Sequence, residues 1–135
     1  MGYTHYWRFN EQPAKEKFAE FVEGVKHIVA TAQEAGVEIG DEKYDWNLVV
    51  FNGVGAGAHE SFFFDYHDFD FGFCKTAQKP YDMAVTASLI LAKKIFGDDI
   101  TITSDGRWTD WESGQLLYES VYDVRPENVL GKVDA

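Results

Sequence analysis

The chain has very little of three things: cysteine, basic residues and long apolar runs. A single cysteine among 135 residues excludes an internal disulfide. No apolar run approaches the roughly 20 residues of a membrane-spanning helix, and no basic-then-apolar signal segment follows Met1. We therefore expect a protein of the cytoplasm, where thiols stay reduced, with no membrane contact.

Basic residues are scarce relative to acidic ones. Lys and Arg number 12 against 23 Asp and Glu, which gives a formal net charge of -11. Such a charge repels nucleic-acid phosphates and anionic lipids over most of a surface, so direct nucleic-acid binding is not expected. An acidic surface can instead imitate a phosphate backbone toward a basic partner protein.

The chain contains no internal repeat, low-complexity segment or linker. A chain of this length buries roughly two-thirds of its unfolded surface as one domain, so we expect a single domain over residues 1–135. Its tail, about residues 124–135, has little patterning and is the part we expect to fray.

Periodicity predicts the main elements. Residues 3–9 alternate as a strand, with His5 and Trp7 on one face. Three- and four-residue apolar steps predict a helix from Pro13 to a stop at Gly36. Residues 46–52 are apolar on both faces, which is typical of a central strand covered on two sides, and residues 60–66 resemble another strand.

The second half continues the same mixture. Pro80 and Asp82 are start signals for a helix that Gly97 ends, and residues 100–104 alternate as a strand. Residues 109–112, "TDWE", have the spacing of a capping box before a third helix. We expect an α+β domain, ordered β-α-β-β-α-β-α, with helices covering a partly antiparallel sheet.

Residues 53–60, "GVGAGAHE", are rich in glycine but fail the test for a dinucleotide fingerprint, because a strand-like run follows where a helix is needed. A hairpin turn, a flexible rim or a loop that closes over a ligand are the alternatives.

Residues 65–73, "DYHDFDFGF", place Asp65 and His67 on one face of an extended chain, and carboxylate and imidazole groups are metal ligands. The spacing matches no particular metal site, so we expect neither a metal nor another cofactor, with Asp65 and His67 as the weak candidates. The alternative is an acidic loop that its phenylalanines anchor to the core.

Residues 73–82, "FCKTAQKPYD", concentrate reactive and basic groups just before the second helix. A helix N-terminus offers unpaired N–H groups and a positive dipole end, to which Lys75, Thr76 and Lys79 add two charges and a hydroxyl. This pattern predicts an anion site. The alternative is that both lysines are solvated or paired with Asp82 and the acidic loop.

Cys74 lies in the same segment. A helix N-terminus and Lys75 would both lower the pKa of its thiol, and His5, His59 or His67 are conceivable bases. No protease or phosphatase signature surrounds it, so a small core residue is the alternative.

Five stretches together resemble a group of small proteins encoded by bacteriophages and by bacteria that carry prophages. They are "GYTHYW" at the N-terminus, "FNG" at 51–53, "FCKTAQKPYD", "SDG" at 104–106 and "DWESGQLLY" at 110–118. The resemblance implies a setting, the cytoplasm of a host cell and a role against host defence, and no activity. Many motif residues are polar and lie at element ends, which suits a pocket.

The leading hypothesis is a protein that binds a small phosphorylated or nucleotide-like ligand, such as a host defence signal, and keeps it from its receptor. Lys75, Thr76 and Lys79 would hold phosphate, and aromatic rings would stack. The predicted ligand-binding residues are His5, Trp7, Asn52, Lys75, Thr76, Lys79, Tyr81, Asp105 and Trp111. We also expect His5 to be buried beside Trp7 and to point into the cavity that residues 74–79 line, within about 15 Å of Lys75.

Two alternatives belong to other classes. A phosphoester hydrolase or nucleotide-modifying enzyme would draw its catalytic residues from His5, His67 and Cys74, with Asp65 and Asp105 orienting the base or a metal. An inhibitor of a host nuclease would need no pocket and would bind the basic surface of the nuclease through an acidic face. Its acidic residues would be Asp65, Asp68, Asp70, Asp98 and Asp99.

Overall fold

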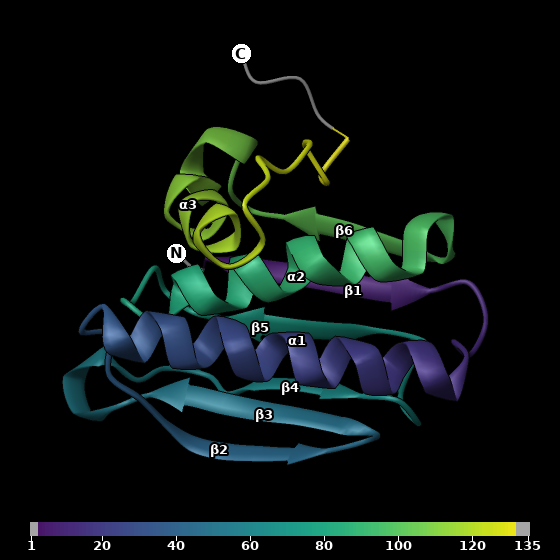
Figure 1. Ribbon diagram of the computed structural model, residues 1–135, viewed down its shortest axis with the longest axis horizontal. Coiled ribbons are helices and arrows are strands. Elements are labelled where there is room, and N and C mark those ends of the chain that lie inside the picture. Colours follow the sequence, from purple (N-terminus) through teal and green to yellow (C-terminus); the bar gives the residue numbers. More distant parts are fainter. Residues whose placement is uncertain (1–2, 132–135) are drawn as a thin grey trace.

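A computed structural model describes residues 3–131, in which three α-helices and six strands form one α+β domain (Figure 1). Gly2 of the first motif lies outside the described residues. The strands are β1 (Thr4–Phe9), β2 (Ile39–Asp45), β3 (Leu48–Gly53), β4 (Phe62–Asp65), β5 (Gly72–Lys75) and β6 (Ile100–Ser104). The helices are α1 (Lys15–Glu34), α2 (Asp82–Phe96) and α3 (Glu112–Tyr122), with short 3-10 turns η1 (Gly55–Gly57), η2 (Gly97–Asp99) and η3 (Trp108–Trp111).

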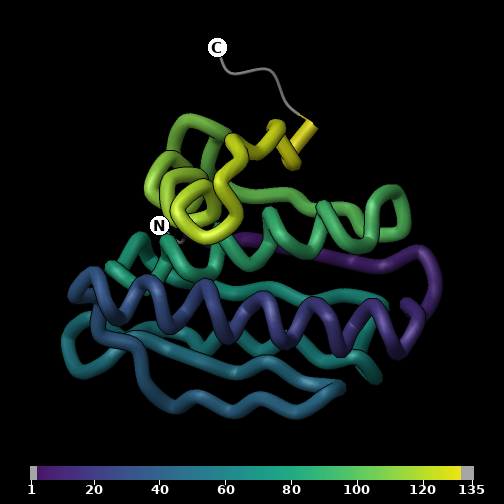
Figure 2. The backbone as a smooth tube through the Cα atoms, viewed as in Figure 1, coloured from purple at the N-terminus to yellow at the C-terminus, as the bar shows by residue number. Residues whose placement is uncertain are grey.

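The strands form two antiparallel sheets of three, in the orders β5-β1-β6 and β2-β3-β4. Figure 2 shows the N-terminal strand β1 running between β5 and β6, although the three strands are far apart in sequence. The two sheets lie edge to edge in one layer, and the helices cover one face of it (Figure 1).

The α+β class, the antiparallel pairing and the helix positions agree with the sequence prediction, but the predicted order lacks two strands. β2 was missed because it is an edge strand, mostly exposed, whose pairing with β3 shifts register between Gly40 and Lys43. β5 was missed because it has only four residues, with Phe73 exposed.

Residues 109–112 do not form the predicted capping box. Residues 108–111 make the turn η3, and the Asp110 carboxylate accepts the backbone N–H of Arg107 at 2.8 Å. Because the carboxylate at position 110 takes this role, the capping interaction lies one turn before α3 begins at Glu112.

The core lies between the helices and the covered face of the strand layer and is rich in aromatic rings. Trp7 stacks on Phe64 with ring centroids 5.1 Å apart, and Phe21 packs against Phe64 at 4.8 Å. The Trp7 ring also fixes the path of β5, because a Cβ at Gly72 would lie 2.3 Å from the Trp7 Nε1 atom.

The other face of the strand layer carries no helix in Figure 1. Several aromatic side chains are exposed on this face. Phe63 and Phe71 are 51% exposed and Phe73 is 45% exposed. Val50 of β3 pairs with Phe63 on this face and is only partly buried. The expectation that residues 46–52 are covered on both sides is therefore wrong.

The tail from residue 124 has no helix or strand as far as residue 131, but Leu130 is buried in the core cluster. Residues 132–135 lie outside the described residues. No helix within residues 3–131 is long and apolar enough to span a membrane.

Candidate functional site

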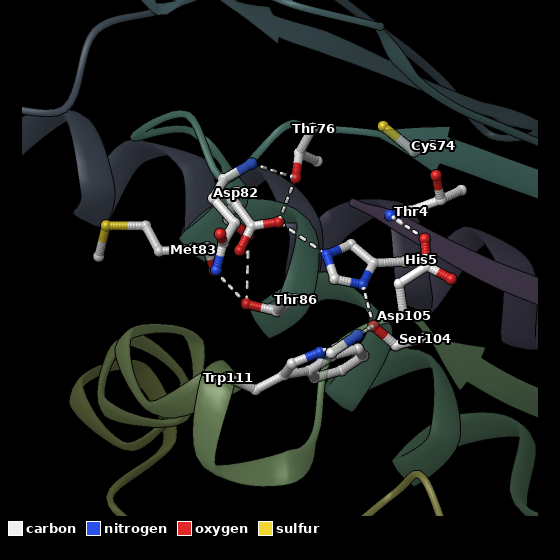
Figure 3. Close-up of polar contacts among 12 residues, drawn as sticks. Thr4, His5, Cys74, Thr76, Asp82, Met83, Thr86, Ser104, Asp105 and Trp111 are labelled. Carbon is white, nitrogen blue, oxygen red and sulfur yellow. Dashed lines mark hydrogen bonds and ion pairs between the residues drawn. The ribbon is translucent and has the colours of Figure 1, made fainter. Parts of the chain in front are cut away.

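Four separate segments meet beside the N-terminus of α2 and bring polar side chains together (Figure 3). They are β1, the loop between β5 and α2, the end of β6 and the turn η3. Figure 3 shows the His5 ring between the Asp82 carboxylate and the Ser104 hydroxyl. Parts of the motifs "GYTHYW", "FCKTAQKPYD", "SDG" and "DWESGQLLY" thus occupy one region.

His5 is the centre of this polar network. Its side chain is 0% exposed, its Nε2 lies 2.7 Å from Asp82 Oδ1, and its Nδ1 lies 2.8 Å from Ser104 Oγ. The rings of Tyr3 and Trp111 meet the imidazole edge-on, at 5.1 and 5.0 Å between centroids. His5 is buried as predicted, but its ring neighbours are Tyr3 and Trp111 rather than Trp7.

The hydrogen bonds of the Ser104 hydroxyl allow us to assign the tautomer of His5. Ser104 Oγ accepts the backbone N–H of Gly106 at 2.9 Å and the indole N–H of Trp111 at 3.3 Å. A hydroxyl oxygen has two lone pairs, so its own proton is directed to His5 Nδ1. The ring proton is then on His5 Nε2, whose N–H donates a hydrogen bond to Asp82 Oδ1.

Asp82 links this buried network to the surface. Its Oδ1 also accepts the Thr76 hydroxyl at 2.5 Å, and Thr76 itself is fully buried. The Asp82 side chain keeps 15% exposure and lines a cavity of about 300 Å³. His5 and Thr76 therefore hold this carboxylate in a fixed orientation at the edge of the cavity.

The loop before α2 is strained at two successive residues. Ala77 and Gln78 have φ values of 53° and 55°, and Lys79 N donates to Thr76 O at 3.0 Å. Two left-handed residues inside such a hydrogen bond are typical of a type I′ turn, which prefers Asn and Gly at these positions. Left-handed conformation costs ordinary residues roughly 1 kcal/mol each, and strain of this kind persists where the surroundings impose it.

The cavity has mixed charge. Its ionisable groups are the Lys79 ammonium and the carboxylates of Asp82 and Asp110. The residues that line it are Val37, Gln78, Lys79, Pro80, Asp82, Met83, Asp110, Ser113 and Gly114. Such a lining suits a ligand that offers hydrogen-bond donors as well as an anionic group.

The two lysines of the predicted anion site are separated. Lys79 lines the cavity, whereas Lys75 does not. Cys74 of β5 is buried and its neighbour Lys75 is exposed, so the alternation of the strand directs Lys75 to the uncovered face. The expected pair of lysines at one site is therefore wrong.

The N-terminus of α2 is also less open than expected. The backbone N–H of Asp82 donates to Lys79 O at 2.8 Å, and that of Ala84 donates to Tyr81 O at 2.9 Å. Since the N–H groups of Asp82 and Ala84 have partners and a carboxylate stands beside them, the helix terminus presents fewer free donors than the sequence suggested.

The three rings predicted to stack on a ligand are all buried. Trp7 packs in the aromatic core, the Tyr81 hydroxyl donates to the carbonyl of Glu60, and Trp111 is bonded to Ser104. Stacking by these rings would need an exposed face that this arrangement does not offer.

Asn52 and Asp105 hold backbone rather than line the cavity. The Asn52 amide donates to His59 O at 3.0 Å, and its carbonyl accepts the N–H groups of Gly53 and His59, which orders the glycine-rich loop. Asp105 Oδ2 accepts the N–H of Thr4 at 3.0 Å. The glycine-rich loop borders the Tyr81 ring, because a Cβ at Gly53 would lie 3.0 Å from it.

Cys74 does not have the environment of a nucleophile. Burial, and then the charge of Glu60, raise the pKa of its thiol to about 12. The expectation that a helix terminus and Lys75 lower this pKa is wrong, because the thiol faces the core and bonds to Glu60 O.

The weak metal candidates lie elsewhere. Asp65 Oδ1 accepts the backbone N–H of His67 at 2.9 Å, and the exposed His67 ring meets Trp46 and Tyr66. Within residues 3–131, no group of three or more His, Cys, Asp or Glu side chains is arranged to hold a metal ion.

Sequence reasoning missed four of the site residues: Gln78, Asp82, Ser104 and Asp110. Asp82 was interpreted as a helix start signal or as a partner of the two lysines, and Ser104 as the last residue of a strand. The available signal was that both stand in the polar motifs at element ends. Comparison with protein-family models, curated proteins and solved structures gives no match.

Proposed function

We propose that this protein binds a small nucleotide-like ligand in the cavity beside the N-terminus of α2 and retains it without turnover. The observation that supports this function most directly is the Asp82 carboxylate, which His5 and Thr76 hold at the edge of a cavity that also contains Lys79.

The charges of the cavity favour a ligand with two kinds of group. The carboxylate oxygens of Asp82 and Asp110 accept hydrogen bonds, so they favour hydroxyl or amino donors over a bare phosphate ion. Lys79 offers three donors to a phosphate group. A nucleotide carries both kinds of group, and about 300 Å³ is at the lower end of ligand-pocket sizes.

Retention without turnover is supported by the state of the reactive groups. A general base must reach the proton that it abstracts, yet both ring nitrogens of the buried His5 are engaged. The Cys74 thiol is buried and its pKa is raised to about 12. Sequestration of a host defence signal fits these groups and the resemblance to phage-encoded proteins.

The separated lysines supply a matched test. Titration calorimetry with adenosine monophosphate should show binding that Lys79→Ala weakens by roughly 10- to 100-fold, the loss of one charge-assisted hydrogen bond. Lys75→Ala removes the same charge from the other face and should change the affinity less than about twofold. Equal effects of the two variants, or no binding of any of the four common nucleoside monophosphates, would contradict the proposal.

A second candidate function, binding of a basic protein, is favoured by the uncovered face. Phe63, Phe71 and Phe73 expose about half of their surface, and exposed apolar patches mark interaction sites. Asp65 ends β4, and the exposed Asp68 and Asp70 follow it in the chain. An affinity-capture experiment from host lysate should first identify a basic host protein that binds this face. The double substitution Phe63→Ser with Phe73→Ser should then abolish capture of that protein and leave nucleotide binding unchanged. Capture that survives this double substitution would count against the interface.

A further inference from the structure

A second cavity lies near the other end of α2 and has the opposite charge character. Its volume is about 460 Å³, and it lies between α2, α3 and the segment that follows α3. The residues that line it are Ile90, Lys93, Lys94, Tyr118, Val124, Arg125, Pro126, Glu127, Asn128 and Val129.

The charge of this lining departs from that of the whole protein. Lys93, Lys94 and Arg125 face one carboxylate, Glu127, so the cavity has a formal charge of +2 (three cations minus one anion) in a chain of charge -11. Positive potential concentrated in a concave site attracts anions.

Each cation keeps donors for a ligand. Lys93 Nζ uses one of its three on Ile100 O at 2.9 Å, and Arg125 Nη1 donates to Glu119 at 3.1 Å. Lys94 is exposed, and within residues 3–131 it has no hydrogen-bond or ion-pair partner.

The rest of the lining is mainly apolar. Ile90 and Tyr118 are buried in the core cluster, and Val124, Pro126 and Val129 lie on the segment after α3. Cationic groups beside an apolar surface match a ligand that has a charged head and an apolar body.

We propose that this cavity binds an amphiphilic anion, a phosphate or carboxylate group attached to a compact apolar ring or chain. Lys94 and Arg125 would hold the anionic group, and Ile90, Tyr118 and Val129 would contact the apolar part. Two lysines in the last turn of α2 also suit the negative end of its dipole. That effect does not account for Arg125, which comes from beyond α3.

This inference does not depend on the proposed nucleotide site, since the two cavities share no lining residue. Phenyl phosphate, benzoate and neutral benzyl alcohol serve as probes in a titration followed by amide NMR. Both anions should shift the amide signals of residues 90–94 and 124–129 with roughly millimolar affinity, as expected for such small ligands. Benzyl alcohol should bind at least about 10-fold more weakly, because it lacks the charge.

The double variant Lys94→Ala with Arg125→Ala should weaken binding of both anions by about 10-fold or more. Lys26→Ala is the matched control, because Lys26 is an exposed lysine on α1 that pairs with Glu23. Circular dichroism establishes that the double variant is folded, and Arg125→Gln provides a single-site variant that keeps most of the side-chain volume. Shifts spread over the whole surface, shifts confined to residues 78–82, or equal effects of the double variant and the control would overturn the proposal.

Discussion

Replacing Ser104 with alanine tests the buried network most directly. The substitution removes one hydroxyl from a buried position at the end of β6 and adds no atom. That hydroxyl bonds to His5 Nδ1, Gly106 N and Trp111 Nε1, at 2.8, 2.9 and 3.3 Å. All three of these residues are buried, so the variant leaves three polar atoms with a missing partner.

The expected loss of stability follows from those three atoms. A buried polar group without a partner costs about 1–3 kcal/mol, which gives an upper range of about 3–9 kcal/mol. Relaxation or a water in the vacated space recovers part of this, so we expect a loss of about 3–5 kcal/mol. A loss of that size is a large fraction of the roughly 5–15 kcal/mol that stabilises a typical domain.

Urea unfolding followed by circular dichroism measures the change without relying on the affected tryptophan. With a slope of about 1–3 kcal/mol per molar urea, the midpoint should fall by at least about 1 M. Thr103→Ala is the control, because Thr103 is the exposed neighbour on the same strand and should cost at most about 1 kcal/mol. A Ser104 loss no larger than the Thr103 loss would refute the proposed network.

Three further predictions concern the same region. Ala77→Gly should raise the free energy of unfolding by about 1 kcal/mol in urea titrations, because it relieves a φ of 53°. Gly97→Ala, at the other end of α2, should lower it by about 1–3 kcal/mol, because a φ of 58° with a ψ of -130° is a conformation that few residues other than glycine adopt. Alkylation of Cys74 by iodoacetamide at pH 8 should occur only through unfolding, so a rate that does not rise with urea would contradict its burial. The Cys74 thiol has a pKa near 9 in the unfolded chain and of about 12 in the folded protein. Its contribution to the free energy of unfolding is therefore complete below pH 9 and falls by about 1.4 kcal/mol per pH unit above it. Cys74→Ala should flatten that part of the curve of stability against pH.

The helices were predictable because each one satisfies several local rules at once. α1 buries the residues that recur at three- and four-residue steps, and α2 follows Pro80 and ends at Gly97 with a left-handed φ. β2 and β5 were not predictable from alternation alone, since much of each strand is exposed and the pairing partner supplies the remaining constraint.

The motifs indicated that polar residues from several elements come together, but not how those residues are arranged. "GYTHYW" and "FCKTAQKPYD" do meet, because β1 and β5 pair with His5 opposite Cys74. The same pairing separates the two lysines, because Lys75 is the last residue of β5 and is exposed, whereas Lys79 lies in the loop that leads to α2. An alternation argument applied to residues 72–75 would have assigned Cys74 and Lys75 to opposite faces.

Asp82 explains why polar motif residues occupy a buried region of so small a domain. A buried polar network is costly unless every member has a partner, and here the partners come from β1, the strained loop, β6 and η3. The network therefore fixes the relative positions of those four segments as well as the direction of one carboxylate. Ala77 and Gln78 keep a conformation that their own side chains do not favour, so the contacts around the loop must impose it, and the same loop supplies Gln78 and Lys79 to the lining of the cavity.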